Sequence, residues 1–85
     1  MQLEKLLHQI RRSPNNVRFT KLCSLLSMLG FSFKGGKGSH RIYIKSGVQE
    51  IVTLQNVDGK VKPYQVRQVL RLIDKYSLTK GERNE

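Results

Sequence analysis

The apolar residues of this chain change their spacing twice along the sequence, and this change constrains the fold more than any other feature. Over residues 2–12 and 20–29 they recur every three or four positions, which is typical of helices that bury one face. Three shorter segments alternate apolar and polar residues, which predicts strands at residues 31–34, 41–45 and 48–54. The helical spacing returns after Pro63, which the first turn of a helix tolerates, and predicts a last helix.

Residues with special backbone preferences separate these segments. Thr20 can cap the second helix through its hydroxyl, and Gly30 can end that helix in the left-handed conformation. Three glycines within residues 35–39 predict a loop. Ser46-Gly47 predicts a two-residue hairpin turn, and residues 56–60 predict a second loop.

The predicted order is helix, helix, three strands, helix, which indicates an α+β two-layer sandwich with helices on one face of the sheet. From the second helix onward the order is α-β-β-β-α, that of a double-stranded-RNA-binding domain. We therefore expect that fold, with a three-stranded antiparallel sheet and an extra N-terminal helix. At 85 residues the chain should form one domain. It divides into a helical extension over residues 1–16, a core over 17–78 and a frayed tail over 79–85.

Positive charge dominates the composition. Sixteen Lys and Arg residues stand against six Asp and Glu residues, which gives a formal net charge of +10. This excess favours a polyanionic partner, most often nucleic acid, although an acidic protein would satisfy it equally well. No apolar run approaches the ~20 residues of a membrane span, and Glu4 among the first leucines is atypical of a secretory signal. We therefore expect a cytoplasmic protein without a membrane partner.

The residues that bind metals are few and scattered. A structural zinc site needs about four clustered ligands, and the chain offers only His8, Cys23 and His40. Glu50, Asp58 and Asp74 fall on a predicted strand, a loop and a helix, which is atypical of a metal-dependent nuclease. We expect no metal and no other cofactor.

The residues best suited to catalysis or phosphate binding lie between the first two predicted strands, in the sequence KGGKGSHR. Glycines allow the backbone to approach a phosphate and leave its amides free to donate hydrogen bonds. The segment supplies positive charge and donors for a phosphate from Lys34, Lys37, Gly38, Ser39 and Arg41. His40 is the one side chain here that exchanges protons near neutral pH. The segment is not a P-loop, because no Gly-Lys-Thr/Ser triplet opens a helix.

Alternatives remain open for several of these residues. His40 shares strand parity with Ile42 and Ile44, so it is either a residue at the buried edge of the core or one that the loop turns outward. Tyr43 projects from the opposite face, where it stacks a nucleobase, packs against a partner or is simply half-exposed. A Gly/Lys hairpin loop is also common as an ordinary solvated turn.

The last helix carries a basic stripe on the side away from its apolar residues. Arg67, Arg71 and Lys75 recur every four positions there. Such a stripe is either a solvated face or, given the charge of the whole chain, a set of phosphate contacts.

The segments from Thr20 to Gly30 and from Lys34 to His40 resemble the HicA toxins of bacterial type II toxin–antitoxin systems. The resemblance covers about residues 17–76, and its most specific part is the Gly-Ser-His triplet after the Lys/Gly loop. Two features depart from the family pattern. Arg41 stands where many members have a second histidine, and the helix at 2–12 extends beyond the shortest members.

The resemblance implies a double-stranded-RNA-binding-like fold and the activity of an mRNA interferase, an endoribonuclease that cleaves mRNA without the ribosome. It also implies that His40 is the catalytic histidine and that a cognate HicB antitoxin blocks the site. Arg41 leaves the second proton-transfer group without a candidate.

Two hypotheses for function follow. In the first, His40 is the general acid or base, and Lys37, Arg41 and the loop amides stabilise the phosphorus centre. Lys34 and the two arginines of the last helix, Arg67 and Arg71, hold flanking phosphates. In the second, the chain is a non-catalytic RNA-binding module and His40 is a contact residue.

Overall fold

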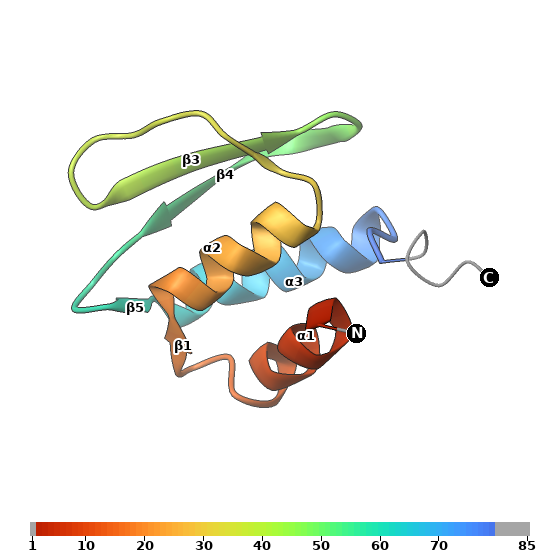
Figure 1. Ribbon diagram of the computed structural model, residues 1–85, viewed down its shortest axis with the longest axis horizontal. Coiled ribbons are helices and arrows are strands. Elements are labelled where there is room, and N and C mark those ends of the chain that lie inside the picture. Colours follow the sequence, from red (N-terminus) through yellow and green to blue (C-terminus); the bar gives the residue numbers. More distant parts are fainter. Residues whose placement is uncertain (1, 80–85) are drawn as a thin grey trace.

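The computed structural model describes residues 2–79, which form three helices and two small sheets (Figure 1). The elements in chain order are α1 (Gln2–Arg12), β1 (Val17–Arg18), α2 (Phe19–Met28), β2 (Ser32–Phe33), β3 (His40–Lys45), β4 (Val48–Gln55), β5 (Lys60–Val61) and α3 (Pro63–Lys75). The main sheet is antiparallel with strand order β2-β3-β4. The α+β prediction, with a double-stranded-RNA-binding-like order and an added N-terminal helix, is confirmed.

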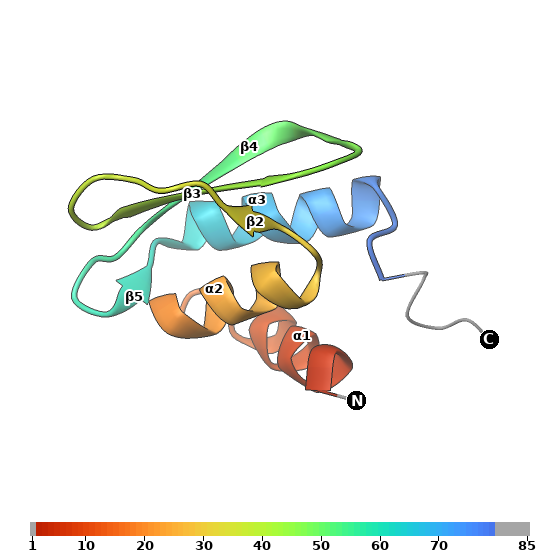
Figure 2. The ribbon, with the colours of Figure 1, turned by 45° about the horizontal axis from the view of Figure 1, so that its top comes forward.

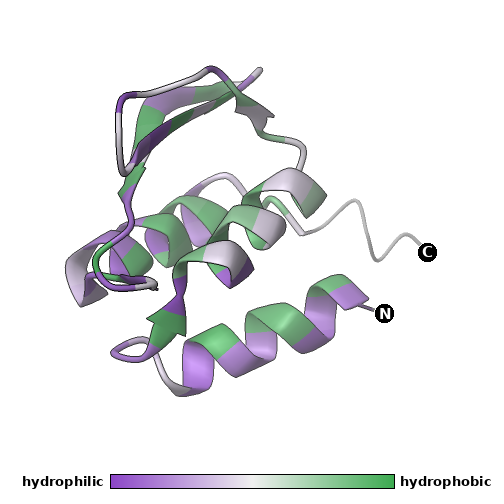
Figure 3. Ribbon diagram, turned by 60° about the vertical axis from the view of Figure 1, so that its left-hand side comes forward, coloured by the Kyte–Doolittle hydropathy of each residue, from purple (hydrophilic) through white to green (hydrophobic). Residues whose placement is uncertain are grey.

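The helices lie on one side of the main sheet. α2 and α3 run beneath it, and α1 lies beneath α2 on the far side from the strands (Figure 2). α2 carries few hydrophilic residues, as its central position between α1 and the sheet requires (Figure 3). α1 contributes Leu3, Leu7 and Ile10 to the core, and an ion pair from Arg11 to Asp74 at 2.9 Å joins it to α3.

The start of α2 differs from the prediction. The helix begins at Phe19 with Arg18 in the N-cap position, and no side chain caps its free amides. The expected cap at Thr20 is wrong because Phe19 is already helical and buries its ring in the core. The end of α2 is as predicted, since Gly30 follows with a φ of 94°.

The inner face of the sheet is formed by alternate residues of β3 and β4. Tyr43, Val52 and Leu54 are buried there against the helices. Ile42 and Ile44 instead project from the outer face, where Ile44 is exposed. The prediction that Tyr43 could stack a nucleobase is therefore wrong, because its ring is part of the core.

Side chains at the two ends of α3 close the free edge of β4. The backbone N–H of Gln55 donates to Oε1 of Gln65, and Nε2 of Gln65 donates to the carbonyl of Thr53, both at 3.2 Å. At the other end of β4, the N–H of Gln49 donates to the hydroxyl of Tyr76 at 3.3 Å. Gln65 is buried, and its amide fixes the first turn of α3 against the end of β4.

A second, two-stranded sheet was not expected. β1 pairs with β5, so that Val17 lies opposite Val61 and Arg18 opposite Lys60. The predicted loop at 56–60 thus ends in a strand. The predicted frayed tail at 79–85 falls almost entirely outside the described residues.

Candidate functional site

The loop of residues 34–39 is anchored at both of its ends. The N–H of Lys34 donates to the carbonyl of Ile42, and the N–H of Ile42 donates to the carbonyl of Gly35, both at 2.7 Å. The N–H of Asn56 donates to the carbonyl of Ser39 at 2.9 Å, which ties the loop to the chain after β4. The loop and the β4–β5 connection consequently extend from the same end of the molecule (Figures 1 and 2).

The middle of the loop has unused hydrogen-bond donors. Within residues 2–79, the backbone amides of residues 35–39 donate to no protein group. Lys37, Gly38 and Ser39 are exposed, and so is Lys34 at the base of the loop. Neither of the two ion pairs formed within the described residues includes a residue of the loop. Free amides beside unpaired lysines form a surface that suits an anion.

Gly36 determines how closely the loop passes His40. A Cβ atom at Gly36 would lie 2.2 Å from the carbonyl oxygen of His40, a distance that no side chain tolerates. Glycine is therefore required for the loop to lie against the first residue of β3.

His40 opens β3 and is exposed, which answers the question of whether it lies in the core. It pairs with Gln55 and shares the outer sheet face with Ile42. Among the described residues, none forms a hydrogen bond with its imidazole. Both ring nitrogens are thus free to exchange a proton with a bound molecule.

Arg41 projects from the other face of the sheet. Its guanidinium carbon lies 5.0 Å from the ring centre of Phe33 and 5.7 Å from that of Phe19, so that both rings contact the cation. His40 and Arg41 are adjacent in sequence but lie on opposite sides of the strand. A bound polymer that contacts both His40 and Arg41 must therefore pass around the edge of the sheet at the loop.

The structure does not place Arg67 and Arg71 beside His40. Nη1 of Arg67 donates to Oδ1 of Asn15 at 3.4 Å, in the turn between α1 and β1. Arg67 therefore lies on the helical side of the sheet, whereas His40 projects from the outer sheet face. Lys75, the third residue of the stripe, pairs with Glu50 at 2.7 Å.

Glu50 is the carboxylate of the described residues whose pKa departs most clearly from its ordinary value. Hydrogen bonds from Lys75 and from the hydroxyl of Tyr76 lower the pKa of Glu50 to about 2, and Glu50 in turn raises the pKa of Lys75. This trio joins β4 to the last turn of α3. It holds the two elements together, and its charged groups are already paired with one another.

Sequence reasoning missed two features of this end of the molecule. The pairing of β1 with β5 brings Arg18 beside Lys60, and both are exposed. A two-residue strand is too short to show a periodicity, so the isolated valines 17 and 61 were the only sequence indication of this pairing. The second missed feature is the exposure of Phe33. The sequence placed Phe33 on a strand, but its exposure depends on how far the helices extend beneath the sheet.

Comparison with known families shows to which of them the chain belongs. Residues 19–74 match the model of the HicA toxin of bacterial toxin–antitoxin systems. The chain belongs to the HicA toxin family. It is thus the toxin of a toxin–antitoxin pair, and the family implies a cognate antitoxin. No curated protein and no solved structure matches this HicA toxin significantly.

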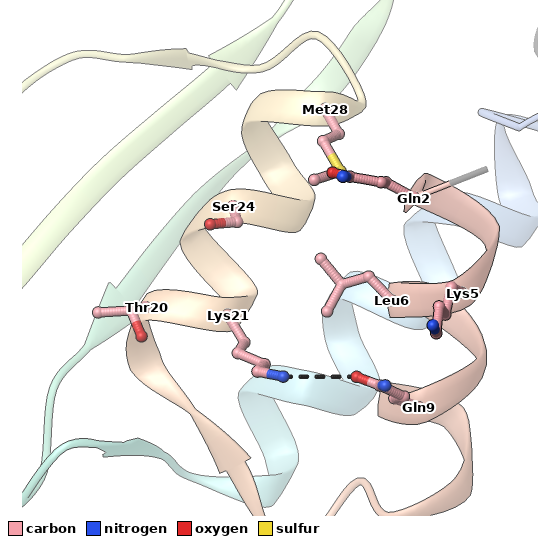
Figure 4. A pocket seen from close by; sticks show the side chains of 8 residues that line it. All are labelled: Gln2, Lys5, Leu6, Gln9, Thr20, Lys21, Ser24 and Met28. Atoms are coloured by element: carbon pink, nitrogen blue, oxygen red, sulfur yellow. Dashed lines mark hydrogen bonds between the residues drawn. The ribbon is translucent and has the colours of Figure 1, made fainter.

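The part of this HicA toxin that precedes the family match is α1 with β1. α1 and α2 enclose a groove in which Nζ of Lys21 donates to Oε1 of Gln9 at 3.5 Å (Figure 4). The groove is lined by Gln2, Lys5, Leu6, Gln9, Thr20, Lys21, Ser24 and Met28. None of these exchanges protons near neutral pH, so this groove of the HicA toxin offers no general acid or base.

Membrane spans and metal clusters are both absent from the described residues of the HicA toxin. Within residues 2–79, no helix is both long and apolar enough to span a bilayer. Over the same residues, His, Cys, Asp and Glu side chains do not gather in groups of three or more that could bind a metal ion.

Proposed function

We propose that this HicA toxin is an mRNA interferase, a cytoplasmic endoribonuclease in which His40 acts as general acid or base. One observation carries the proposal: His40 is exposed and unpartnered among the described residues, beside a loop whose amides and lysines are free to bind a phosphate. A cleaving protein needs a proton-transfer group and an anion-binding surface at the same place. A cognate HicB-like antitoxin would keep this site inactive.

The reaction uses a nucleophile that belongs to RNA. The 2′-oxygen attacks the adjacent phosphorus, the bond to the 5′-oxygen of the next nucleotide breaks, and a 2′,3′-cyclic phosphate and a 5′-hydroxyl result. One proton leaves the 2′-oxygen and one reaches the 5′-oxygen. Neutral His40 accepts the first, or protonated His40 donates the second. Because RNA supplies the nucleophile, the mechanism requires no metal.

The loop would stabilise the negative charge that builds on the phosphate oxygens. The free amides of residues 36–39 and the ammonium of Lys37 are donors that need no rearrangement of the fold. Lys34 would hold the next phosphate along the strand. Arg67 and Arg71, on the far side of α3, would meet only a more distant part of the RNA.

The test compares the two histidines of the chain. His40→Ala should lower cleavage of an unstructured RNA in EDTA by about 10²–10⁴-fold, the contribution of one general acid or base. The control is His8→Ala, which removes an exposed histidine of α1 and should cleave at the wild-type rate. Circular dichroism checks that both variants fold.

The outcome also decides the competing function. A wild-type protein that binds this RNA in EDTA without producing 5′-hydroxyl ends would be the non-catalytic RNA-binding module. A folded His40→Ala variant with full activity would remove His40 from the mechanism.

A further inference from the structure

Phe33 is a large aromatic residue that the fold leaves open. The chain has three phenylalanines, and Phe19 and Phe31 are 7% and 6% exposed, whereas Phe33 is 54% exposed. It ends β2, one of the two edge strands of the main sheet, and directly precedes the loop of residues 34–39. Exposed aromatic rings on strands are a common means by which proteins bind unpaired nucleobases.

The ring of Phe33 is held in a fixed position although it is exposed. Phe33 pairs across the strands with buried Tyr43, and the two rings lie 5.7 Å apart at 51°. The guanidinium of Arg41 lies 5.0 Å from the ring centre on the same side of the sheet. These contacts orient the ring. The guanidinium lies over one face of the ring, so a base would stack on the other face. A base on the ring would have its phosphate within reach of Arg41.

Phe33 lies close to His40 along the sheet. Its cross-strand partner Tyr43 is three residues from His40, or about 10 Å at ~3.3 Å per residue. Phe33 and His40 project from opposite faces, with the loop of residues 34–39 at the edge between them. An RNA strand that crosses this edge would meet Phe33, the loop amides and His40 in succession.

We propose that Phe33 and Arg41 form a nucleobase-binding subsite for single-stranded RNA. The base stacks on Phe33 and Arg41 contacts the adjacent phosphate. The proposal rests on the ribonuclease function proposed above. Stacking is tolerant of sequence because every base has a π-face, so the subsite selects unpaired nucleotides over duplex rather than one base over another.

Tryptophan fluorescence tests the contact directly, because the chain has no tryptophan. Phe33→Trp in the His40→Ala background gives a single-tryptophan protein that does not consume its ligand. Addition of an unstructured 12-nucleotide RNA should quench this tryptophan, and the same sequence as a duplex should not. The matched control is Ile51→Trp, at a residue 61% exposed on the outer face of β4. Its emission should stay unchanged at saturating RNA.

Binding measurements give the size of the effect. In the same background, Phe33→Ala and Phe33→Leu should each weaken binding of the 12-mer by about 5- to 150-fold, the range for loss of one stacked base. Phe33→Tyr keeps a ring and should bind like the parent. Equal losses for Ala and Leu would show that the ring, rather than apolar area, makes the contact.

The possible failures separate the two proposals. If RNA does not quench the Phe33→Trp variant and Phe33→Ala binds RNA like the parent, the subsite is overturned, while cleavage by the wild type would still support the ribonuclease. If the wild type neither binds nor cleaves RNA, the ribonuclease proposal fails and the subsite fails with it. If Phe33→Ala loses affinity for the antitoxin but keeps affinity for RNA, Phe33 is a protein anchor and the subsite is overturned.

Discussion

At the scale of single residues, the closest constraint on the site is the contact between Gly36 and the backbone of His40. Gly36→Ala would place a Cβ atom 2.2 Å from the His40 carbonyl oxygen, so the loop must move away from β3. We expect RNA cleavage to fall at least about tenfold, because an ångström-scale displacement of a catalytic group can cost ~10²-fold. The rate of cleavage of a short RNA in EDTA measures this.

The control for Gly36 is Gly47 in the β3–β4 turn. Gly47 has a φ of 90°, and a Cβ atom added there would meet no other atom within 4 Å, so Gly47→Ala strains the backbone without moving the loop. Both variants should lose stability in urea, but only Gly36→Ala should lose activity. Full activity in Gly36→Ala would mean that the loop need not lie against His40.

The sequence was sufficient to locate the loop and His40, but not to decide which face each strand residue occupies. β3 carries apolar residues on both faces, with Tyr43 on one side and Ile42 and Ile44 on the other. The alternation suggested that the face of Ile42 and Ile44 is the buried one, and the structure has the opposite orientation. The choice depends on which face α2 and α3 cover, and that is a property of the packed molecule.

At the scale of elements, Gln65 joins the start of α3 to the end of β4. Gln65→Leu would leave the N–H of Gln55 and the carbonyl of Thr53 without their partner. We expect a loss of about 1–3 kcal/mol in the free energy of unfolding, the net contribution of two hydrogen bonds at about 0.5–1.5 kcal/mol each. Urea denaturation measures it, with Gln68→Leu on the same helix as control. Equal stability of the two variants would contradict this role for Gln65.

The contact between β4 and the last turn of α3 should make stability depend on pH. The pKa of Glu50 is about 2 in the fold, below its ordinary value of 4.5, because Lys75 and Tyr76 hold its charged form. Its contribution is complete above pH ~4.5 and is lost as the pH falls toward 2. Thermal melts between pH 6 and 2.5 should show a smaller fall in Tm for Glu50→Gln than for the wild type.

Glu4→Gln is the control for this pH effect. Glu4 lies exposed on α1 and takes part in neither ion pair formed within the described residues. Its replacement should leave the pH dependence of Tm as in the wild type. If Glu50→Gln behaves in the same way, the trio does not contribute to acid stability.

Long elements were predictable from the sequence and short ones were not. The three helices and the strands β3 and β4 have enough residues for their periodicity to be visible. β1 and β5 have two residues each and form because α2 and α3 bring their valines together. The start of α2 was misjudged because the burial of Phe19, rather than a cap at Thr20, determines where the helix begins.

At the scale of the whole molecule, we expect the antitoxin to act by covering the end of the molecule that carries the loop of residues 34–39. Its toxin-binding part should be acidic, because the toxin has a net charge of +10 and steering by opposite charge speeds association. Hydrogen exchange on the co-purified pair should show the largest gain in protection over residues 34–45. Strands β2, β3 and β4 should keep their pairing, because occlusion of the site requires no change of fold.

Free toxin under the same conditions is the reference for this experiment. A stable complex in which residues 34–45 exchange as fast as in free toxin would place inhibition elsewhere. The exposed isoleucines of the outer sheet face, Ile44 and Ile51, lie beyond the loop and would then be the next surface to examine.

The contacts along the edge of β4 also bear on how this protein avoids polymerising. An open strand edge can recruit the same strand of another copy and start a fibril. Here the amide of Gln65 and the hydroxyl of Tyr76 occupy backbone groups near both ends of β4, so only a short stretch around Ile51 lies between them. The opposite edge, β2, has only two residues. Copies of this toxin thus have little free strand edge through which to join their main sheets.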